Sequence, residues 1–156
     1  MKTLVVQDII QVLKPGDILC ITSNGCVRKD GCCVMGRGIA AQASRLFPGF
    51  QLKVGQLIKQ HGNRCFNVGK YPFRSGQVHL ATFVVKHHWS DAADLELIKR
   101  SVGEIEQLAD KFGWKRIYLP APGCGNGRRA WQDVKPLVES LDDRFTIVFR
   151  QVPEEF

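Results

Sequence analysis

Two patterns of apolar residues alternate along the chain. Short runs rich in apolar residues and bounded by glycine, proline or polar residues are typical of buried strands, and they occur at residues 4–6, 17–22, 65–68, 78–85, 117–119 and 145–149. Apolar residues at helical spacing predict helices over residues 39–46, 51–60, 94–112 and 131–141. Because strands alternate with helices, we expect a three-layer α/β fold in which helices cover both faces of a largely parallel sheet.

The length and composition of the chain fit one globular domain. Of its 156 residues, 44% are hydrophobic and 24% are charged, so we expect a single domain over residues 1–156. No apolar run is long enough to span a bilayer, and residues 1–8 lack the apolar core of a signal peptide. We therefore expect a cytoplasmic protein without membrane contact, and a monomer.

The cysteines do not have the spacing of a zinc site. There are six, and no two pairs of them form C-x-x-C motifs at finger distance; they are Cys20, Cys26, Cys32, Cys33, Cys65 and Cys124. A reducing compartment disfavours disulfides. We expect free thiols, no bound metal and no cofactor.

Two glycine-rich clusters predict a phosphate-bearing ligand. They occupy residues 30–40 and residues 122–127. Glycine lets the backbone approach an anion and point successive N–H groups at it, and a helix that begins at the first cluster adds its positive end. Ligands of such sheets bind at the carboxyl ends of strands. Both clusters and Lys86 follow predicted strands, so we expect them to share one edge.

The charge of the chain favours an anionic partner. Lys and Arg number 22 against 15 Asp and Glu, which gives a net charge of +7. The basic residues are spread along the chain and form no block. This distribution fits a phosphorylated ligand or a modified nucleic acid, and it also leaves open a protein that binds nucleic acid through charge alone.

The order of several motifs resembles that of macrodomains, the family with the ADP-ribose-binding fold. These motifs are Gly16-Asp17-Ile18, Asn24, residues 34–40, residues 122–127 and Trp131. The chain is most similar to the branch that contains antitoxin macrodomains, which remove ADP-ribose from DNA, and hydrolases that release ADP-ribose from glutamate. Stand-alone macrodomains of phages and bacteria also look like this. The resemblance covers nearly the whole chain and implies a three-layer α/β/α fold with a central mixed sheet.

The resemblance also implies a set of ligand-binding residues. Asp17 would accept a hydrogen bond from the adenine amino group, and two loops would wrap the pyrophosphate and the distal ribose. The residues implied are Asp17, Ile18, Val34, Met35, Gly36, Arg37, Gly38, Ile39, Pro122, Gly123, Cys124, Gly125, Asn126 and Gly127. On position alone, Asp17 after Pro-Gly is equally a turn or cap residue, and each cluster alone is more often an ordinary turn. Phe149 or Arg150 is our expected stacking partner for adenine.

Lys86 and Asn24 are the expected catalytic residues. In the similar hydrolases, a lysine at this point of the strand attacks the anomeric carbon of the distal ribose, and Lys86 falls on the matching position. Asn24 would face the ribose hydroxyls, which an amide can both donate to and accept from. Without the resemblance, Lys86 is the solvated end of a strand and Asn24 a turn residue. We interpret Cys124 as a small residue whose N–H matters, and His87 and His88 as surface residues.

These expectations favour an enzyme that recognises ADP-ribose. It would either cleave the bond between ADP-ribose and an acceptor or remove the phosphate of ADP-ribose 1''-phosphate. In the glutamate-specific hydrolases an aspartate assists the lysine, whereas this chain has Gly127 there, as does the antitoxin branch. We therefore favour a nucleic-acid acceptor over protein glutamate. The alternatives are a reader module that binds ADP-ribose without turnover and a basic nucleic-acid-binding protein.

Overall fold

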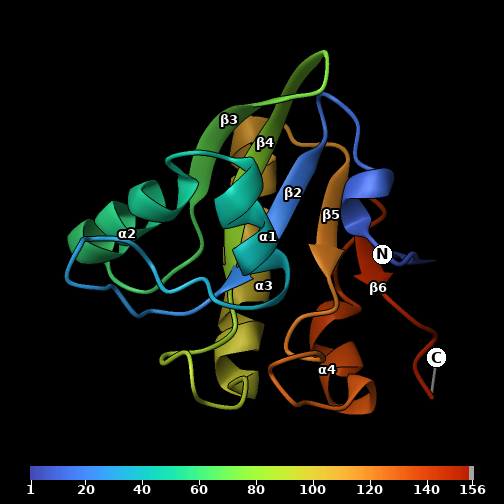
Figure 1. The fold of residues 1–156 in the computed structure, drawn as a ribbon. Helices are drawn as coiled ribbons and strands as arrows, with labels where there is room; N and C mark the ends of the chain where they lie inside the picture. The colour runs from blue at the N-terminus through green and yellow to red at the C-terminus, as the bar shows by residue number, and fades with distance from the viewer. Residues whose placement is uncertain (155–156) are drawn as a thin grey trace.

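A single mixed sheet runs through the molecule. The computed structural model describes residues 1–154, in which six strands are ordered β1-β6-β5-β2-β4-β3 (Figure 1). Neighbouring strands are parallel except β3 and β4, which pair antiparallel at one edge. The predicted mixed, largely parallel sheet is therefore confirmed. The strands are β1 (Lys2–Val5), β2 (Ile18–Ser23), β3 (Asn67–Phe73), β4 (Gly76–Val84), β5 (Ile117–Pro120) and β6 (Phe145–Phe149).

Helices cover both faces of the sheet and complete the three layers. On one face lie α3 (Leu95–Phe112) and α4 (Trp131–Val138), and on the other lie α1 (Gly38–Leu46), α2 (Phe50–His61) and the short 3-10 helix η1 (Ile9–Gln11). Side chains of a strand alternate between faces. Accordingly, Cys20 of β2 packs with the α3 and α4 side, whereas Leu19 and Ile21 pack with the α1 and α2 side.

The longest helix begins and ends where its sequence provides caps. The carboxylate of Asp94 accepts the N–H of Leu97 at 3.2 Å, which satisfies a free amide of the first turn. Gly113 ends α3 in the left-handed conformation, with φ of 66°. Between these caps an apolar stripe is buried against the sheet, as the spacing of residues 94–112 predicts.

Two elements differ from the predictions. The strand expected at residues 65–68 is instead β3, which begins at Asn67 and continues to Phe73 in a hairpin with β4. Pro72 is accepted there because β3 is an edge strand, where one missing donor breaks no inner ladder. The turn η1 has too few residues to produce an apolar period, so the pattern missed it.

The first residues of the first glycine cluster form a segment that rests on α2. Gln51 binds both backbone groups of Cys33. The side-chain amide of Gln51 donates to the carbonyl of Cys33 at 2.8 Å, and the backbone carbonyl of Gln51 accepts the N–H of Cys33 at 3.1 Å. A Cβ atom on Gly55 would lie 1.8 Å from the carbonyl oxygen of Gly31. Only glycine therefore allows α2 and this segment to approach so closely.

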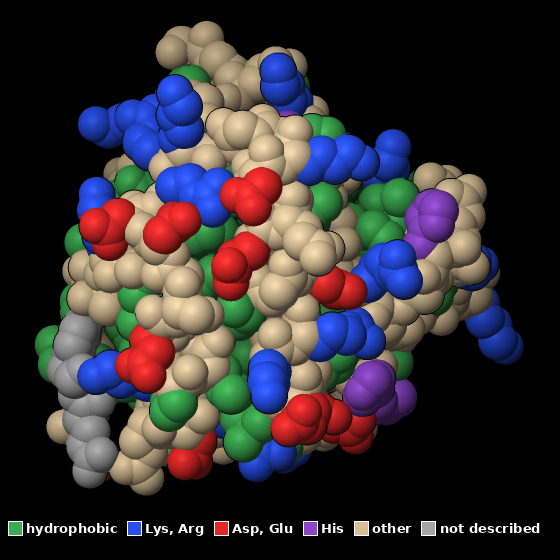
Figure 2. All heavy atoms as spheres, turned by 180° about the vertical axis from the view of Figure 1, so that it is seen from behind, with side chains coloured by type: hydrophobic (Ala, Val, Ile, Leu, Met, Phe, Trp, Pro, Cys, Tyr) green, Lys and Arg blue, Asp and Glu red, His purple; other side chains and the backbone are tan. Residues whose placement is uncertain are grey.

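The face formed by α3 and α4 carries charges of both signs. Figure 2 shows Lys and Arg side chains interspersed with Asp and Glu on this side, without one continuous basic block.

All six cysteines are free thiols. Within residues 1–154, no helix is long and apolar enough to cross a membrane, and no three His, Cys, Asp or Glu side chains group as metal ligands.

Candidate active site

A cavity of about 1280 Å³ opens at the carboxyl ends of the parallel strands. Residues 34–40 form part of one wall, residues 123–129 form part of another, and Lys86 lies between strand β4 and the exposed loop that follows it. The two glycine clusters and Lys86, which are far apart in the sequence, thus line one cavity. Of the expected ligand-binding residues in the second cluster, Pro122 alone is buried without lining it.

The first wall ends in the free amino end of a helix. Helix α1 begins at Gly38, and its N-cap residue Arg37 provides no side-chain hydrogen bond to the first turn. The first amides of a helix lack partners within that helix and carry partial positive charge. Gly38 has a φ of 58°, and a Cβ atom there would lie 3.3 Å from the side-chain nitrogen of Asn126. This wall is therefore suited to an anion and nearly touches the second wall.

The second wall is a tight loop of glycines. No hydrogen bond formed within residues 1–154 uses the amide N–H of Gly125, Asn126 or Gly127. The loop is closed instead by the N–H of Arg129, which donates to the carbonyl of Gly123 at 2.9 Å. Three successive free amides beside a helix end form an anion-binding concavity of the kind that holds phosphate.

Close backbone contacts attach this loop to the segment that carries Lys86. A Cβ atom on Gly127 would lie 2.6 Å from the carbonyl oxygen of Gly123 and 2.9 Å from the Cβ atom of Ala93. The N–H of Ala93 donates to the carbonyl of Gly127 at 2.9 Å, and the side chain of Arg129 donates to the carbonyl of Ala93 at 2.5 Å. The loop and the connection between β4 and α3 therefore form one unit.

Lys86 is half-buried at the junction of these segments. Its Nζ atom donates to the carbonyl oxygens of Trp89 at 3.2 Å and of Asn126 at 3.3 Å. A neutral amine keeps two N–H donors and gains a lone pair, so it can hold both carbonyls and still present the lone pair to a ligand. The two contacts position Lys86 in either protonation state.

The surroundings of Lys86 favour loss of its proton. Burial lowers the pKa of the ammonium, and the positive charges of Arg128 and Arg37 lower this pKa further, while Asp91 offsets part of the effect. A lysine with a lowered pKa is more often neutral near physiological pH and is then a nucleophile. The site thus combines walls of free backbone amides, which suit an anion, with an amine whose pKa is lowered.

The thiol of Cys124 lacks this activation. Burial raises the pKa of Cys124 to about 11, and the Sγ atom lies 3.6 Å from the carbonyl oxygen of Pro122. A thiol in this environment stays protonated and is a poor nucleophile. Lys86 is therefore the better candidate of the two.

Curated proteins with similar sequences come from bacteria. The chain is 26% identical over 149 residues to DNA ADP-ribosyl glycohydrolases of Mycobacterium tuberculosis and Mycobacterium bovis, and each match covers 89% of this chain and 38% of the relative. It is 27% identical over 109 residues to the protein of the same name from Thermus aquaticus, covering 68% of this chain and 30% of that relative. The chain therefore spans under two fifths of the length of these relatives. No family model matches the sequence.

Solved structures share the complete fold. The macrodomain of Mycobacterium tuberculosis DarG superposes with a TM-score of 0.77 at 23% identity, covering 97% of this chain and 99% of that one. The chain has the macrodomain fold. The macrodomain of Thermus aquaticus DarG gives a TM-score of 0.70 at 22% identity, covering 96% and 98%. Thermosipho africanus DarTG, solved in complex with ADP-ribose, gives 0.70 at 22% identity, covering 88% of this chain and 40% of that chain.

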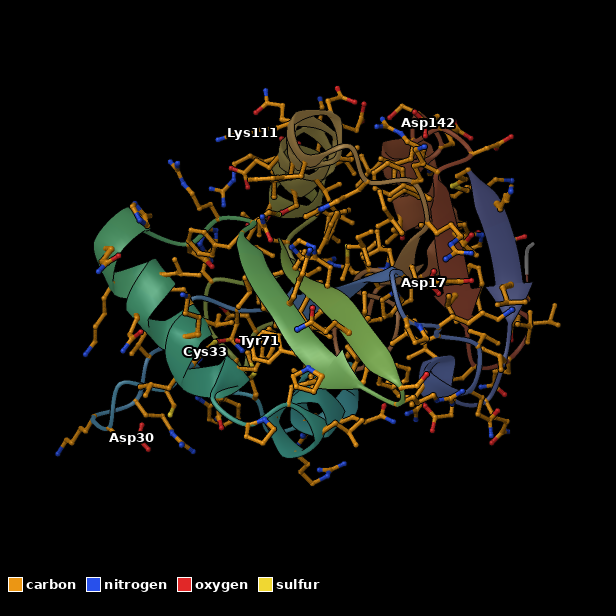
Figure 3. The ribbon with its side chains drawn as sticks, turned by 90° about the horizontal axis from the view of Figure 1, so that it is seen from above. Asp17, Asp30, Cys33, Tyr71, Lys111 and Asp142 are labelled. Atoms are coloured by element: carbon orange, nitrogen blue, oxygen red, sulfur yellow. The ribbon has the colours of Figure 1, made fainter. Side chains whose placement is uncertain are left out.

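Asn24 lines the cavity and also holds its wall. Its side-chain nitrogen donates to the carbonyl of Val34 at 3.0 Å, and its side-chain oxygen accepts the N–H of Cys26 at 2.9 Å. One N–H and one lone pair of the amide remain for a ligand. The loop of residues 27–31 does not line the cavity, and Figure 3 shows Asp30 in this loop, beside α2 and away from the sheet.

Asp17 and Ile18 are not at the cavity, which contradicts their expected role in binding adenine. They lie at the amino end of β2, the end from which Figure 3 is seen, and Asp17 is only 1% exposed. The Asp17 carboxylate pairs with Arg116 at 2.8 Å and accepts the N–H of Lys14 at 2.9 Å. Ile18 borders a separate hollow of about 520 Å³. The physical reason is strand direction, because the carboxyl end of β2 faces the cavity.

A second aspartate lies nearer the cavity and was missed in the sequence. Asp8 follows β1 and caps η1 by accepting the N–H of Ile10 at 3.0 Å. Its carboxylate also accepts a hydrogen bond at 3.0 Å from the side chain of Gln42, which lines the cavity together with Ile9. An Asp-Ile pair occurs twice in the sequence, and only the first follows a strand. That difference was the signal available.

The end of the cavity near Asp8 carries apolar and aromatic side chains beside Arg150. Phe149, the last residue of β6, and Arg150, which follows it, both line the cavity. Val6 and Ile9 follow β1, the strand next to β6 in the sheet, and line the cavity as well. The ring of Trp131 packs edge-on against Phe149, with centroids 4.8 Å apart. Trp131 is only 6% exposed and itself lines the cavity, so it holds the ring of Phe149 in place from beside it.

The close approach at Gly127 predicts that alanine substitutions at two glycines of one loop differ sharply in their effect on stability. Gly127→Ala forces a Cβ atom against the backbone of Gly123, and we expect it to lower the free energy of unfolding by about 1–3 kcal/mol. Gly125→Ala is the matched control, because a Cβ atom there meets nothing within 4 Å, and we expect a change within about 0.5 kcal/mol. Urea denaturation measures both. Equal stability of the two variants would contradict the packing described.

Proposed function

We propose that this macrodomain is a hydrolase that removes ADP-ribose from DNA. The observation that carries the proposal is the place of the Lys86 amine, which the carbonyls of Trp89 and Asn126 hold in a cavity whose two walls present free backbone amides. The names of the curated relatives, DNA ADP-ribosyl glycohydrolase, support the reaction and the acceptor. We further propose that residues 1–156 act as one domain, as a monomer and in the cytoplasm.

The ligand lies along the carboxyl edge of the sheet in this proposal. The pyrophosphate sits between the amino end of α1 and the loop of residues 123–127, where amides and Arg37 offset its charge. Adenine occupies the end near Ile9 and Phe149, and Asp8 takes the role expected of Asp17 by accepting from the adenine amino group. The distal ribose then reaches Lys86 at the opposite end.

Lys86 attacks the anomeric carbon of the distal ribose. The neutral amine forms a bond to this carbon, the bond from the carbon to the acceptor breaks, and the acceptor takes up the proton that the amine loses. The resulting linkage opens to a Schiff base, which one water molecule hydrolyses to free ADP-ribose and the lysine amine. The net reaction consumes one water.

The packing at Gly127 supports an acceptor other than protein glutamate. The glutamate-specific hydrolases that the chain resembles use an aspartate at this place. A Cβ atom at position 127 would already lie 2.6 Å from the carbonyl oxygen of Gly123. An aspartate therefore does not fit unless the loop moves, and Lys86 works without such an assistant.

The role of Lys86 predicts separate effects on binding and turnover. Lys86→Ala should retain ADP-ribose affinity within a few-fold but lose more than about a hundredfold in turnover of ADP-ribosylated DNA, because the nucleophile is absent. Lys86→Arg is the control for charge, since a guanidinium does not deprotonate, and it should be equally inactive. Calorimetry measures the affinity and release of ADP-ribose measures turnover. Full activity of either variant would overturn this mechanism.

The lowered pKa of Lys86 predicts how the rate depends on pH. Below this pKa the amine is protonated and cannot attack, so the rate should rise with pH and level off below the ordinary lysine value. Borohydride added during turnover should reduce the Schiff base and attach ADP-ribose covalently to Lys86, which mass spectrometry detects. Turnover in wild type without any adduct would instead assign Lys86 an electrostatic role. Binding without turnover would indicate a reader module.

The exchange of aspartate roles is tested on both affinity and stability. Asp8→Asn should weaken ADP-ribose binding about tenfold, because the amide changes the hydrogen bonds both to adenine and to Gln42. Asp17→Asn should leave affinity unchanged and lower the free energy of unfolding, because it weakens the pairing of a buried carboxylate with Arg116. Calorimetric titration and urea denaturation of both variants measure these effects. The opposite assignment of the two effects would refute our placement of adenine.

A further inference from the structure

An exposed tryptophan stands beside the proposed nucleophile. Trp89 lines the cavity, and 52% of its surface is exposed to solvent. Its backbone carbonyl accepts the hydrogen bond from Lys86, so the ring belongs to the same short loop as the reacting amine. Large aromatic side chains are usually buried, at least in part, and an exposed one beside a site often marks a place where a partner binds.

The loop that carries Trp89 is held in place from several sides. The carbonyl of His87 accepts the N–H of Gly25 at 3.1 Å, and the carbonyl of Ser90 accepts from the side chain of Arg128 at 3.3 Å. The N–H of Ser90 donates to the ring of His88 at 3.2 Å, and that ring lies 5.5 Å from the ring of Trp89. The tryptophan is therefore presented in a defined position, which reduces the entropy that a partner has to remove.

Two arginines lie on the cavity side of this loop. Arg37 and Arg128 both lie near enough to act on the charge of Lys86, and both line the cavity. Asp91 is an acidic side chain whose effect on the pKa of Lys86 has the opposite sign. An aromatic ring among cations is the arrangement with which proteins hold single-stranded nucleic acid, since the ring stacks on a base while the cations contact phosphates.

The place of Trp89 along the sheet separates it from the adenine end. It follows β4, whereas Phe149 belongs to β6 and Val6 follows β1. The order of the strands puts β4 four steps from β1, which at the usual spacing is about 19 Å. The adenine of the ADP-ribose and the ring of Trp89 therefore occupy opposite ends, and the acceptor leaves the cavity on the Trp89 side.

We propose that Trp89 stacks on a nucleobase next to the ADP-ribosylated nucleotide and makes this macrodomain prefer an oligonucleotide acceptor over a single nucleotide. This inference rests on the proposed function, because it concerns the DNA part of the same substrate. Trp89 acts by positioning the strand, and Lys86 carries the reaction. The base that stacks is unpaired, since a base within a duplex has both faces covered.

The test compares one modification on two acceptors. An ADP-ribosylated oligonucleotide of about ten nucleotides and a single ADP-ribosylated nucleotide are hydrolysed by wild type, Trp89→Ala and Trp89→Phe. Trp89→Ala should lower kcat/KM about tenfold on the oligonucleotide and leave the value for the nucleotide unchanged. Trp89→Phe should keep most of the activity on the oligonucleotide, because a phenyl ring still stacks.

Phe112→Ala is the matched control for an exposed aromatic residue. Phe112 is 45% exposed at the end of α3 and does not line the cavity, so this variant should match wild type on both acceptors. An equal loss in Trp89→Ala on both acceptors, or no loss on either, would overturn the inference. Wild type inactive on both would overturn the proposed function instead. In that case, fluorescence anisotropy with the unmodified oligonucleotide decides the role of Trp89, since equal affinity of wild type and Trp89→Ala contradicts it.

Discussion

The site depends on one close backbone approach, where Gly123 and Gly127 meet Ala93. Side chains on these glycines would lie 2.6–2.9 Å from the facing atoms, so only bare backbone allows the contact. The approach closes the second loop and joins it to the connection from β4 to α3 through the N–H of Ala93. Free amides of the loop and the Lys86 amine are thereby fixed relative to each other. Catalysis that relies on position and on aimed dipoles needs this rigidity.

The parallel strands place this loop at one edge of the sheet, along which the cavity runs, and the two ends of the cavity differ in chemistry. Because β1, β6, β5, β2 and β4 run in one direction, their carboxyl ends form one edge. Near β1 and β6 the edge is apolar, with Ile9 and Phe149, and near β4 it carries Lys86 and is flanked by Arg37 and Arg128. In our proposal, the base of the ligand therefore lies near Phe149 and the reacting sugar lies near Lys86.

Much of this arrangement could be predicted from the sequence because it rests on local patterns. Glycine clusters and a lysine after predicted strands were enough to place residues 34–40, residues 123–127 and Lys86 along one edge. The error at Asp17 has a definite cause, since the Gly-Asp-Ile motif was weighed without its place at the amino end of the strand expected at residues 17–22. Asp8 stands after β1 and caps the three-residue helix η1, and Asp17 stands before β2. The sequence pattern gave no signal for Trp89, because this residue lies in a loop and only the fold shows that it lines the cavity.

Calorimetric titration with ADP-ribose and with AMP tests the central claim most directly, that two facing walls hold a diphosphate. AMP has the adenosine and one phosphate but lacks the second phosphate and the distal ribose. Our account predicts micromolar binding of ADP-ribose, about −8 kcal/mol, and binding of AMP that is at least about a hundredfold weaker. Absence of ADP-ribose binding, or equal affinity for the two ligands, would contradict it.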